Sequence, residues 1–153
     1  MDVCCLNRSF DDLGQERIRL EAEAILWILQ CCQNHEWSLL NSNALEFELE
    51  KTPMREKAEQ VASLLALAQS RIDSNEGIQT RAKALISIGF KLYDALHIAF
   101  AEAANVDVML TTDDRLLRRA LRCKEELRVS VENPVIWLMN VMQSATGEDN
   151  DTN

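Results

Sequence analysis

Apolar residues recur at helical spacing along most of this chain, and short apolar runs separate the helical stretches. One face of the helix predicted over residues 15–33 carries Ile18, Ala22, Ile25, Leu29 and Cys32. The same periodicity predicts helices over residues 44–50, 53–70, 78–88, 93–104, 115–122 and 134–142. Short apolar runs predict strands over residues 3–6, 37–40, 106–110 and 127–131. Strands that alternate with helices indicate an α/β fold whose sheet is mainly parallel, with helices on both faces.

Length and composition place these elements in one domain. The chain has 153 residues, of which 47% are hydrophobic and 27% charged, and a single domain usually spans about 100–200 residues. We expect the domain to occupy residues 1–143. The remaining residues, 144–153, are polar and acidic, and we expect a disordered tail there.

The expected cellular setting follows from patterns that the sequence lacks. No apolar run approaches the roughly 18 residues that a membrane-spanning helix needs, and the N-terminus lacks the pattern of a secretory signal. We therefore expect a cytoplasmic protein without membrane contacts. The five cysteines are odd in number and have no metal-ligand spacing, so we interpret them as small buried apolar side chains.

Acidic residues stand at or just after the predicted strands. They are Asp2, Glu46, Glu48, Asp94, Asp113 and Asp114. Ligands bind beyond the carboxyl ends of parallel strands, and carboxylates that converge there repel one another unless cations neutralise them. Oxygen ligands suit Mg²⁺ or Mn²⁺, which indicates a metal-dependent nuclease. The alternative explanation is structural: the three later aspartates suit helix N-caps, and the glutamates suit an exposed helix face.

The segment DALHIAFAEAANVDVMLTTDDRLLRRA, residues 94–120, strongly resembles the second half of PIN domain proteins, particularly the VapC-like toxins of bacterial toxin–antitoxin pairs. In that family an aspartate opens a helix, and a strand ends in Thr-x-Asp about twenty residues later. Asp94 and Asp113 match these positions. The opening DVCCLNR resembles the family's first motif, which makes Asp2 its aspartate. The second acidic residue usually follows a serine by about six residues, which gives Glu48, with Glu46 as the alternative.

The resemblance extends over residues 2–141 and implies a three-layer α/β/α sandwich around a central, mainly parallel sheet. It also implies an endoribonuclease that depends on Mg²⁺ or Mn²⁺. The implied catalytic residues, which are also the metal ligands, are Asp2, Glu48, Asp94 and Asp113. A metal-bound water would attack the RNA phosphodiester in line, and Thr111 or Thr112 are candidates to orient it. The implied partners are a small antitoxin protein and a second copy of the chain, which apolar stretches between residues 56 and 88 would contact.

The first motif departs from the family pattern in two ways. The family's small polar residue two positions after the aspartate is Cys4 here, a poorer hydrogen-bond donor. Family members place several apolar residues before the aspartate, and only Met1 precedes Asp2. We expect the short strand to weaken metal affinity. It also motivates a second hypothesis, a degenerate PIN module that binds RNA or a partner protein without cleavage. A phosphoacceptor signalling domain is a third, although no lone aspartate ends a central strand.

Basic residues are candidates to contact the RNA backbone. Arg115, Arg118 and Arg119 recur at helical spacing directly after the Thr-x-Asp motif. In a chain of net charge −9, this local stripe suggests contact with phosphates, and a solvated helix face is the alternative. Arg8 is expected either to bind the substrate phosphate or to pair with an acid. His97, which follows the DAL motif, is expected to be packed and hydrogen-bonded and not to be a metal ligand.

Overall fold

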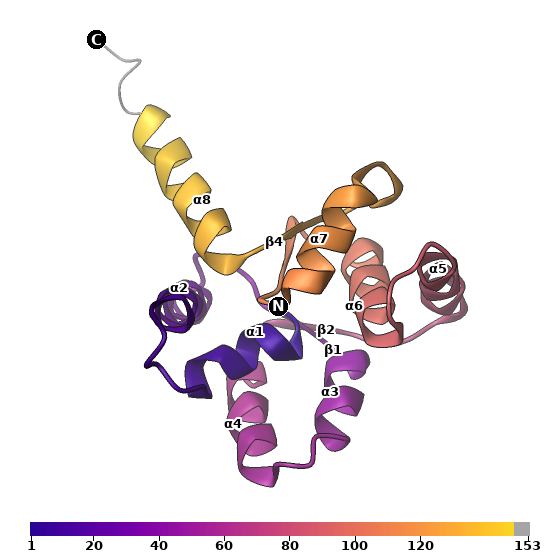
Figure 1. Cartoon of the computed structure of the whole chain (residues 1–153), viewed down its shortest axis with the longest axis horizontal. Helices are drawn as coiled ribbons and strands as arrows, with labels where there is room; N and C mark the ends of the chain where they lie inside the picture. The colour runs from indigo at the N-terminus through magenta and orange to yellow at the C-terminus, as the bar shows by residue number, and fades with distance from the viewer. Residues whose placement is uncertain (149–153) are drawn as a thin grey trace.

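The computed structural model describes residues 1–148 and alternates helices with short strands (Figure 1). Its α-helices are α1 (Val3–Asn7), α2 (Glu16–Gln33), α3 (Asn43–Glu50), α4 (Arg55–Leu65), α5 (Glu76–Ser87), α6 (Leu92–Ala103), α7 (Asp114–Arg122) and α8 (Pro134–Glu148). Two short 3-10 helices, η1 (Arg8–Phe10) and η2 (Lys124–Glu126), follow α1 and α7. The strands are β1 (Leu40–Ser42), β2 (Ser70–Ile72), β3 (Val108–Leu110) and β4 (Ser130–Glu132).

The strands of residues 1–148 form two separate parallel pairs. β1 pairs with β2, and β3 pairs with β4. Parallel pairs need a crossover, which α3 and α4 provide for the first pair and α7 for the second. The expected mixed α/β class with parallel strands is therefore present. The expected single central sheet is not, because the described strands do not join into one sheet.

The predicted strand over residues 3–6 is wrong, since these residues form α1. Asp2 caps this helix, and its Oδ1 accepts a hydrogen bond from the Cys5 N–H at 2.7 Å. Only the backbone of Asp2 itself is extended, and its N–H donates to the Leu110 carbonyl at the end of β3. A run of four apolar residues fits a strand or a buried helix equally, and the aspartate cap favours the helix.

Several element boundaries differ from the expected ones. β1 overlaps the strand predicted over residues 37–40 only at Leu40, β3 is shorter than predicted, and β4 begins and ends later. α4 ends at Leu65, so the helix predicted to reach residue 70 is too long. β2 begins at Ser70, where that helix was expected to end. α8 continues to Glu148, so residues 144–148 are helical where a disordered tail was expected. Residues 149–153 of the predicted tail lie outside the described residues.

Two apolar clusters hold the elements together. One gathers side chains of α5, α6, β3 and α7, including Leu85, Ile98 and Leu116. The other gathers α1, α2, α3 and α4 and includes Leu6 and Ile25. Both clusters include fully buried residues. This close packing holds α1, α6 and α7 in place, and with them the residues at the N-terminal ends of these helices. Within residues 1–148, no helix combines the length and apolarity needed to cross a membrane.

Candidate active site

Four elements place the four predicted carboxylates. Asp2 is the N-cap of α1, Glu48 lies on α3, Asp94 lies in the first turn of α6, and Asp113 is the N-cap of α7. The thiol of Cys4 lies within electrostatic reach of all of them. Partial burial of the thiol, followed by the negative charges of the four carboxylates, raises the pKa of Cys4 to about 12. The fold therefore brings together acids that are up to 111 positions apart in the sequence.

Cys4 is the residue that sequence reasoning misjudged. It was expected to be a buried apolar side chain like Cys5, which is buried. Cys4 is instead exposed, and its thiol is free. Because the helix α1 turns Cys4 away from Cys5, one cysteine packs in the core and its neighbour faces the acids.

Asp2 is the most enclosed of the four acids. Its residue is 4% exposed, and burial raises the pKa of its carboxyl group. A hydrogen bond from the Thr111 side chain, the charge of His97 and the Cys5 N–H partly oppose that rise. Asp2 thus has partners on three sides and is held by its neighbours before any ligand binds.

Asp94 and Asp113 differ in their local partners. Burial raises the pKa of Asp94, and the negative charges of Asp113 and Asp2 raise it further. Asp94 is not a helix cap, because the N-cap position of α6 belongs to Lys91. Asp113 does cap its helix, and its Oδ1 accepts the Arg115 N–H at 2.7 Å. A capping role therefore explains Asp113 in part but does not explain Asp94.

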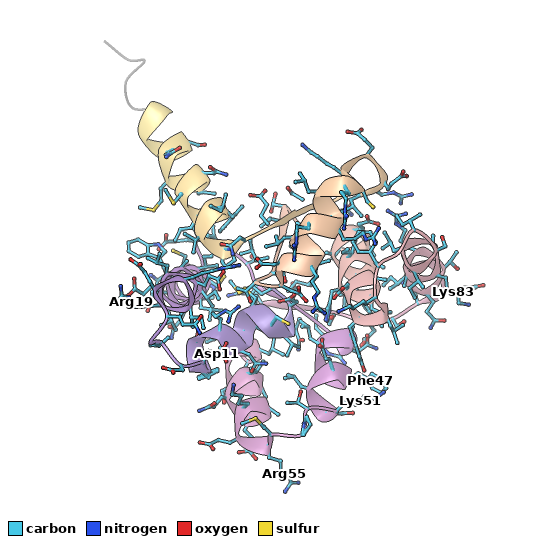
Figure 2. The ribbon with its side chains drawn as sticks, viewed as in Figure 1. Asp11, Arg19, Phe47, Lys51, Arg55 and Lys83 are labelled. Carbon is cyan, nitrogen blue, oxygen red and sulfur yellow. The ribbon has the colours of Figure 1, made fainter. Side chains whose placement is uncertain are left out.

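The two candidate glutamates of α3 lie in different surroundings. Glu48 Oε2 is 2.7 Å from His97 Nε2, and this histidine is buried. Glu46 instead pairs with Arg71, which lowers the pKa of that glutamate. The outer face of α3 carries Phe47, which is 51% exposed, with Lys51 Nζ 4.1 Å above its ring (Figure 2). The helix thus turns Glu48 towards α6 and the other acids, and Glu46 away from them.

Asp114 follows Asp113 directly but lies outside the cluster. Its Oδ2 accepts a hydrogen bond from Arg17 Nη1 at 2.8 Å. This pairing lowers the pKa of Asp114. Asp113 and Asp114 are therefore a natural comparison, because they are neighbours in sequence with different electrostatic roles.

The two threonines before Asp113 are buried, so neither presents its hydroxyl to bulk water. Thr111 bonds to the Asp2 side chain, and its Oγ1 also accepts the Asp113 N–H at 3.1 Å. Among the described residues 1–148, Thr112 Oγ1 is buried without a hydrogen-bond partner. Thr111 therefore positions two of the acids, a role that sequence reasoning missed because it depends on the contact between α1 and β3.

A basic pocket of about 290 Å³ opens beside Asp94. Its cationic lining comprises Lys91, Arg115, Arg118, Arg119 and Arg122. Gly89 forms part of the wall with φ +99°, and a Cβ added there would lie 3.0 Å from Arg119 Cζ. The three arginines predicted to contact RNA thus lie together next to one of the acids. Lys91, which precedes α6, was not anticipated.

Arg8 takes part in a different set of contacts. Its Nε lies 2.8 Å from Glu21 Oε2, and its Nη1 lies 3.1 Å from Asp11 Oδ2. Glu21 is buried on α2 and also accepts a hydrogen bond from Asn133 at 2.9 Å. Of the two roles expected for Arg8, the arrangement favours pairing with acids, which ties η1 to α2.

The donor chemistry of the four carboxylates fits a hard divalent cation, because all their ligand atoms are oxygens. Among residues 1–148, however, no three His, Cys, Asp or Glu side chains stand close enough together to hold an ion. Glu48 is bonded to His97 and Asp113 to the amides of α7. Coordination would therefore require these side chains to exchange protein partners for the cation.

Comparison with known proteins gives one match. A family model described as the PIN domain matches residues 35–121, more than half of the chain. The matched segment includes Glu48, Asp94 and Asp113, whereas Asp2 lies before it. Neither the curated proteins nor the solved structures gave a match.

Proposed function

Because the chain belongs to the PIN domain family, whose members are generally nucleases that use divalent metal ions, we propose that it is an endoribonuclease dependent on Mg²⁺ or Mn²⁺. The observation that supports this proposal most is the convergence of the four carboxylates around Cys4. Three of them come from the ends of packed elements, which keeps negative charge concentrated at one place. Such a cluster has a strong electrostatic preference for a cation.

In this proposal Asp2, Asp94 and Asp113, with Glu48, hold the cation. A bound divalent cation supplies positive charge that polarises the phosphodiester and acidifies a water molecule. Thr111 keeps Asp2 in place, and His97 keeps Glu48 turned towards the cluster. The chain needs no side-chain nucleophile, which agrees with the high pKa of Cys4, the one thiol at the site.

The basic pocket is proposed to bind the RNA backbone next to the scissile bond. Reversing two charges of the pocket, Arg118→Glu with Arg119→Glu, is expected to weaken RNA binding and to reduce its dependence on salt concentration. Arg19→Glu with Lys83→Glu is the matched control, because both are exposed cations away from the pocket, on α2 and α5, and the net charge changes equally (Figure 2). Equal losses in both variants would mean that only net charge matters.

The biological role is proposed from the likeness of residues 94–120 to VapC-like toxins. In that role the chain is the toxin of a pair in the cytoplasm, a small antitoxin protein restrains it, and two copies associate. A degenerate PIN module that binds without cleaving is the second candidate. The absence of a ready-made group of three metal ligands in residues 1–148 favours that second candidate.

An RNA cleavage assay separates the two candidates. The full chain is incubated with single-stranded RNA and Mg²⁺ or Mn²⁺, with and without a chelator. The nuclease requires cleavage that the chelator abolishes and that Asp94→Asn reduces by about 100-fold or more, while Glu46→Gln leaves it unchanged. RNA that stays bound but intact at every cation concentration would identify the degenerate module.

A further inference from the structure

The basic pocket beside Asp94 holds positive charge that the chain leaves without an acidic partner. Its cations are Lys91, Arg115, Arg118, Arg119 and Arg122. Among residues 1–148, none of these five forms an ion pair with a carboxylate, although acidic residues outnumber Lys and Arg by 25 to 16 in the chain. Outside the pocket, Arg17, Arg71 and Arg81 each pair with an acid. Like charges gathered in one pocket repel one another, so the pocket favours an anionic ligand.

The core holds the walls of this pocket in place. The arginines lie on one side of α7, and Leu116 and Ala120 of the same helix are buried in the apolar cluster that also contains Phe90. Phe90 lines the pocket as well. Arg118 Nε donates to the Asp114 carbonyl at 3.0 Å, which holds that side chain along the helix. The pocket is therefore preformed in large part, which lowers the entropy cost of binding a ligand there.

The pocket is closed on the side of Arg119. The turn before α6 brings Gly89 against the Arg119 guanidinium, and a Cβ added at Gly89 would lie 3.0 Å from Arg119 Cζ. This contact leaves no gap through which an RNA chain could run between the turn and α7. The pocket therefore suits the end of an RNA chain better than a backbone that continues in both directions.

The charge balance of the pocket also distinguishes two kinds of phosphate. Among residues 1–148, Asp94 is the one carboxylate in the lining, against five cations. A phosphodiester inside RNA carries a single negative charge, whereas a terminal phosphomonoester carries about −1.5 to −2 at pH 7 and has three strong acceptor oxygens. An arginine can donate two N–H groups to one phosphate. A terminal phosphate therefore neutralises more of the positive charge and accepts more hydrogen bonds than an internal one.

We propose that the basic pocket binds the terminal phosphomonoester of an RNA strand. This inference rests on the proposed function, in which the pocket contacts RNA, and it specifies which phosphate of the substrate enters. Asp94 both lines the pocket and belongs to the carboxylate cluster, so the terminal phosphate lies next to the proposed site of cleavage. The chain then prefers RNA with a phosphorylated end and cuts close to that end.

Fluorescence anisotropy of a short single-stranded RNA tests the proposal on the full chain, in EDTA so that binding is measured without cleavage. RNA with a 5′-phosphate or a 3′-phosphate carries the dye at the opposite end, and each is compared with the hydroxyl-ended RNA labelled at the same end. We expect one of the two phosphates to tighten binding at least about tenfold, which also identifies the terminus that enters. A methyl ester of that phosphate, which has a single negative charge, should lose most of the gain.

Variants that each remove one positive charge locate the binding. Arg119→Gln is expected to reduce the gain from the terminal phosphate to less than about threefold. Arg122→Gln, at an exposed position of the same pocket, should also reduce it. Arg19→Gln is the matched control and should keep the full gain, because Arg19 is an exposed cation on α2 away from the pocket (Figure 2). Urea unfolding of each variant shows that it is folded.

Three results would overturn the proposal. The first is equal binding of phosphorylated and hydroxyl-ended RNA, and the second is a gain that Arg119→Gln and Arg122→Gln both retain. The third is orthophosphate that displaces every RNA alike without any preference for a phosphorylated end, which would identify a site for free phosphate only. The nuclease proposal fails separately: a chain that prefers phosphorylated ends in EDTA but never cleaves RNA with Mg²⁺ or Mn²⁺ supports this pocket and contradicts only the nuclease.

Discussion

At the residue scale, the raised pKa of Asp94 has a consequence for stability. Its folded-state pKa lies above the unfolded value, about 3.9, because of burial and the charges of Asp113 and Asp2. The folded state then holds the proton more tightly, and its stability falls as the pH rises from the unfolded pKa through the folded one. We expect Asp94→Asn to be more stable than the wild type at pH 7 and to lose less stability between pH 4 and pH 7.

Urea unfolding at a series of pH values measures this difference, with Asp114→Asn as the control of opposite sign. Arg17 lowers the pKa of Asp114, so the Asp114 carboxylate stabilises the fold above its unfolded pKa. This contribution disappears as the pH falls through the folded pKa. An Asp94→Asn protein that is less stable than the wild type at pH 7 would contradict the account.

The reactivity of the Cys4 thiol can report whether a cation binds among the four carboxylates. Because the four carboxylates help to raise the pKa of Cys4, a divalent cation bound among them should lower it. At pH 8.5 we expect Mg²⁺ to accelerate alkylation of Cys4 by iodoacetamide, by about tenfold for each unit by which its pKa falls. Mass spectrometry of the Cys4 peptide measures the rate, with NaCl at equal ionic strength to separate simple screening. Equal rates in Mg²⁺ and NaCl would argue against cation binding at the cluster.

The roles of some of these residues could be predicted from the sequence, and those of others could not. Asp94 and Asp113 could be selected because each stands beside a predicted strand or helix start within a specific motif. The choice of Glu48 over Glu46 rested on spacing alone, and the ion pair of Glu46 with Arg71 now explains why Glu46 lies elsewhere. The prediction that His97 is packed and hydrogen-bonded is confirmed. Its partner Glu48 and the contact of Thr111 with Asp2 could not be foreseen, because each joins elements distant in the chain.

At the element scale, the helices were predicted more closely than the strands, of which only β3 lies wholly within its expected range. α2, α3, α5, α6 and α7 lie within a few residues of their expected positions, because 8–18 residues suffice to display a helical period. Each strand has three residues, too few to display an alternation. β2, with the sequence SRI, has no apolar run at all. The sequence therefore predicted the helices better than the sheet.

The turn between α5 and α6 links backbone conformation to the basic pocket. Gly89 has φ +99° and lies against the Arg119 guanidinium. Gly89→Ala should cost about 1–2 kcal/mol of unfolding free energy and displace Arg119, which should weaken RNA binding. Gly89→Asn is the matched variant, because asparagine tolerates positive φ better; it should unfold at a higher urea concentration than Gly89→Ala yet show the same loss in RNA binding. Wild-type RNA binding by both variants would contradict this role for the pocket.

At the scale of the whole molecule, the proposed RNA binding depends on the local positive charge near the site, because the net charge of the chain is negative. The chain carries a net charge of −9, which opposes RNA as a whole. The basic pocket concentrates five cations beside Asp94, one of the four carboxylates. RNA binding by this chain should therefore depend on that one face and on the cation that we propose the acids bind.

Titration of Mn²⁺ into the full chain, followed by calorimetry, tests the central claim most directly. Asp113→Asn and Asp114→Asn are compared with the wild type, since both remove one charge and asparagine keeps the acceptor that caps α7. The account predicts that Asp114→Asn binds Mn²⁺ as the wild type does, whereas Asp113→Asn binds at least about tenfold more weakly. Equal Mn²⁺ affinity for all three proteins would contradict a metal site built from the converging carboxylates.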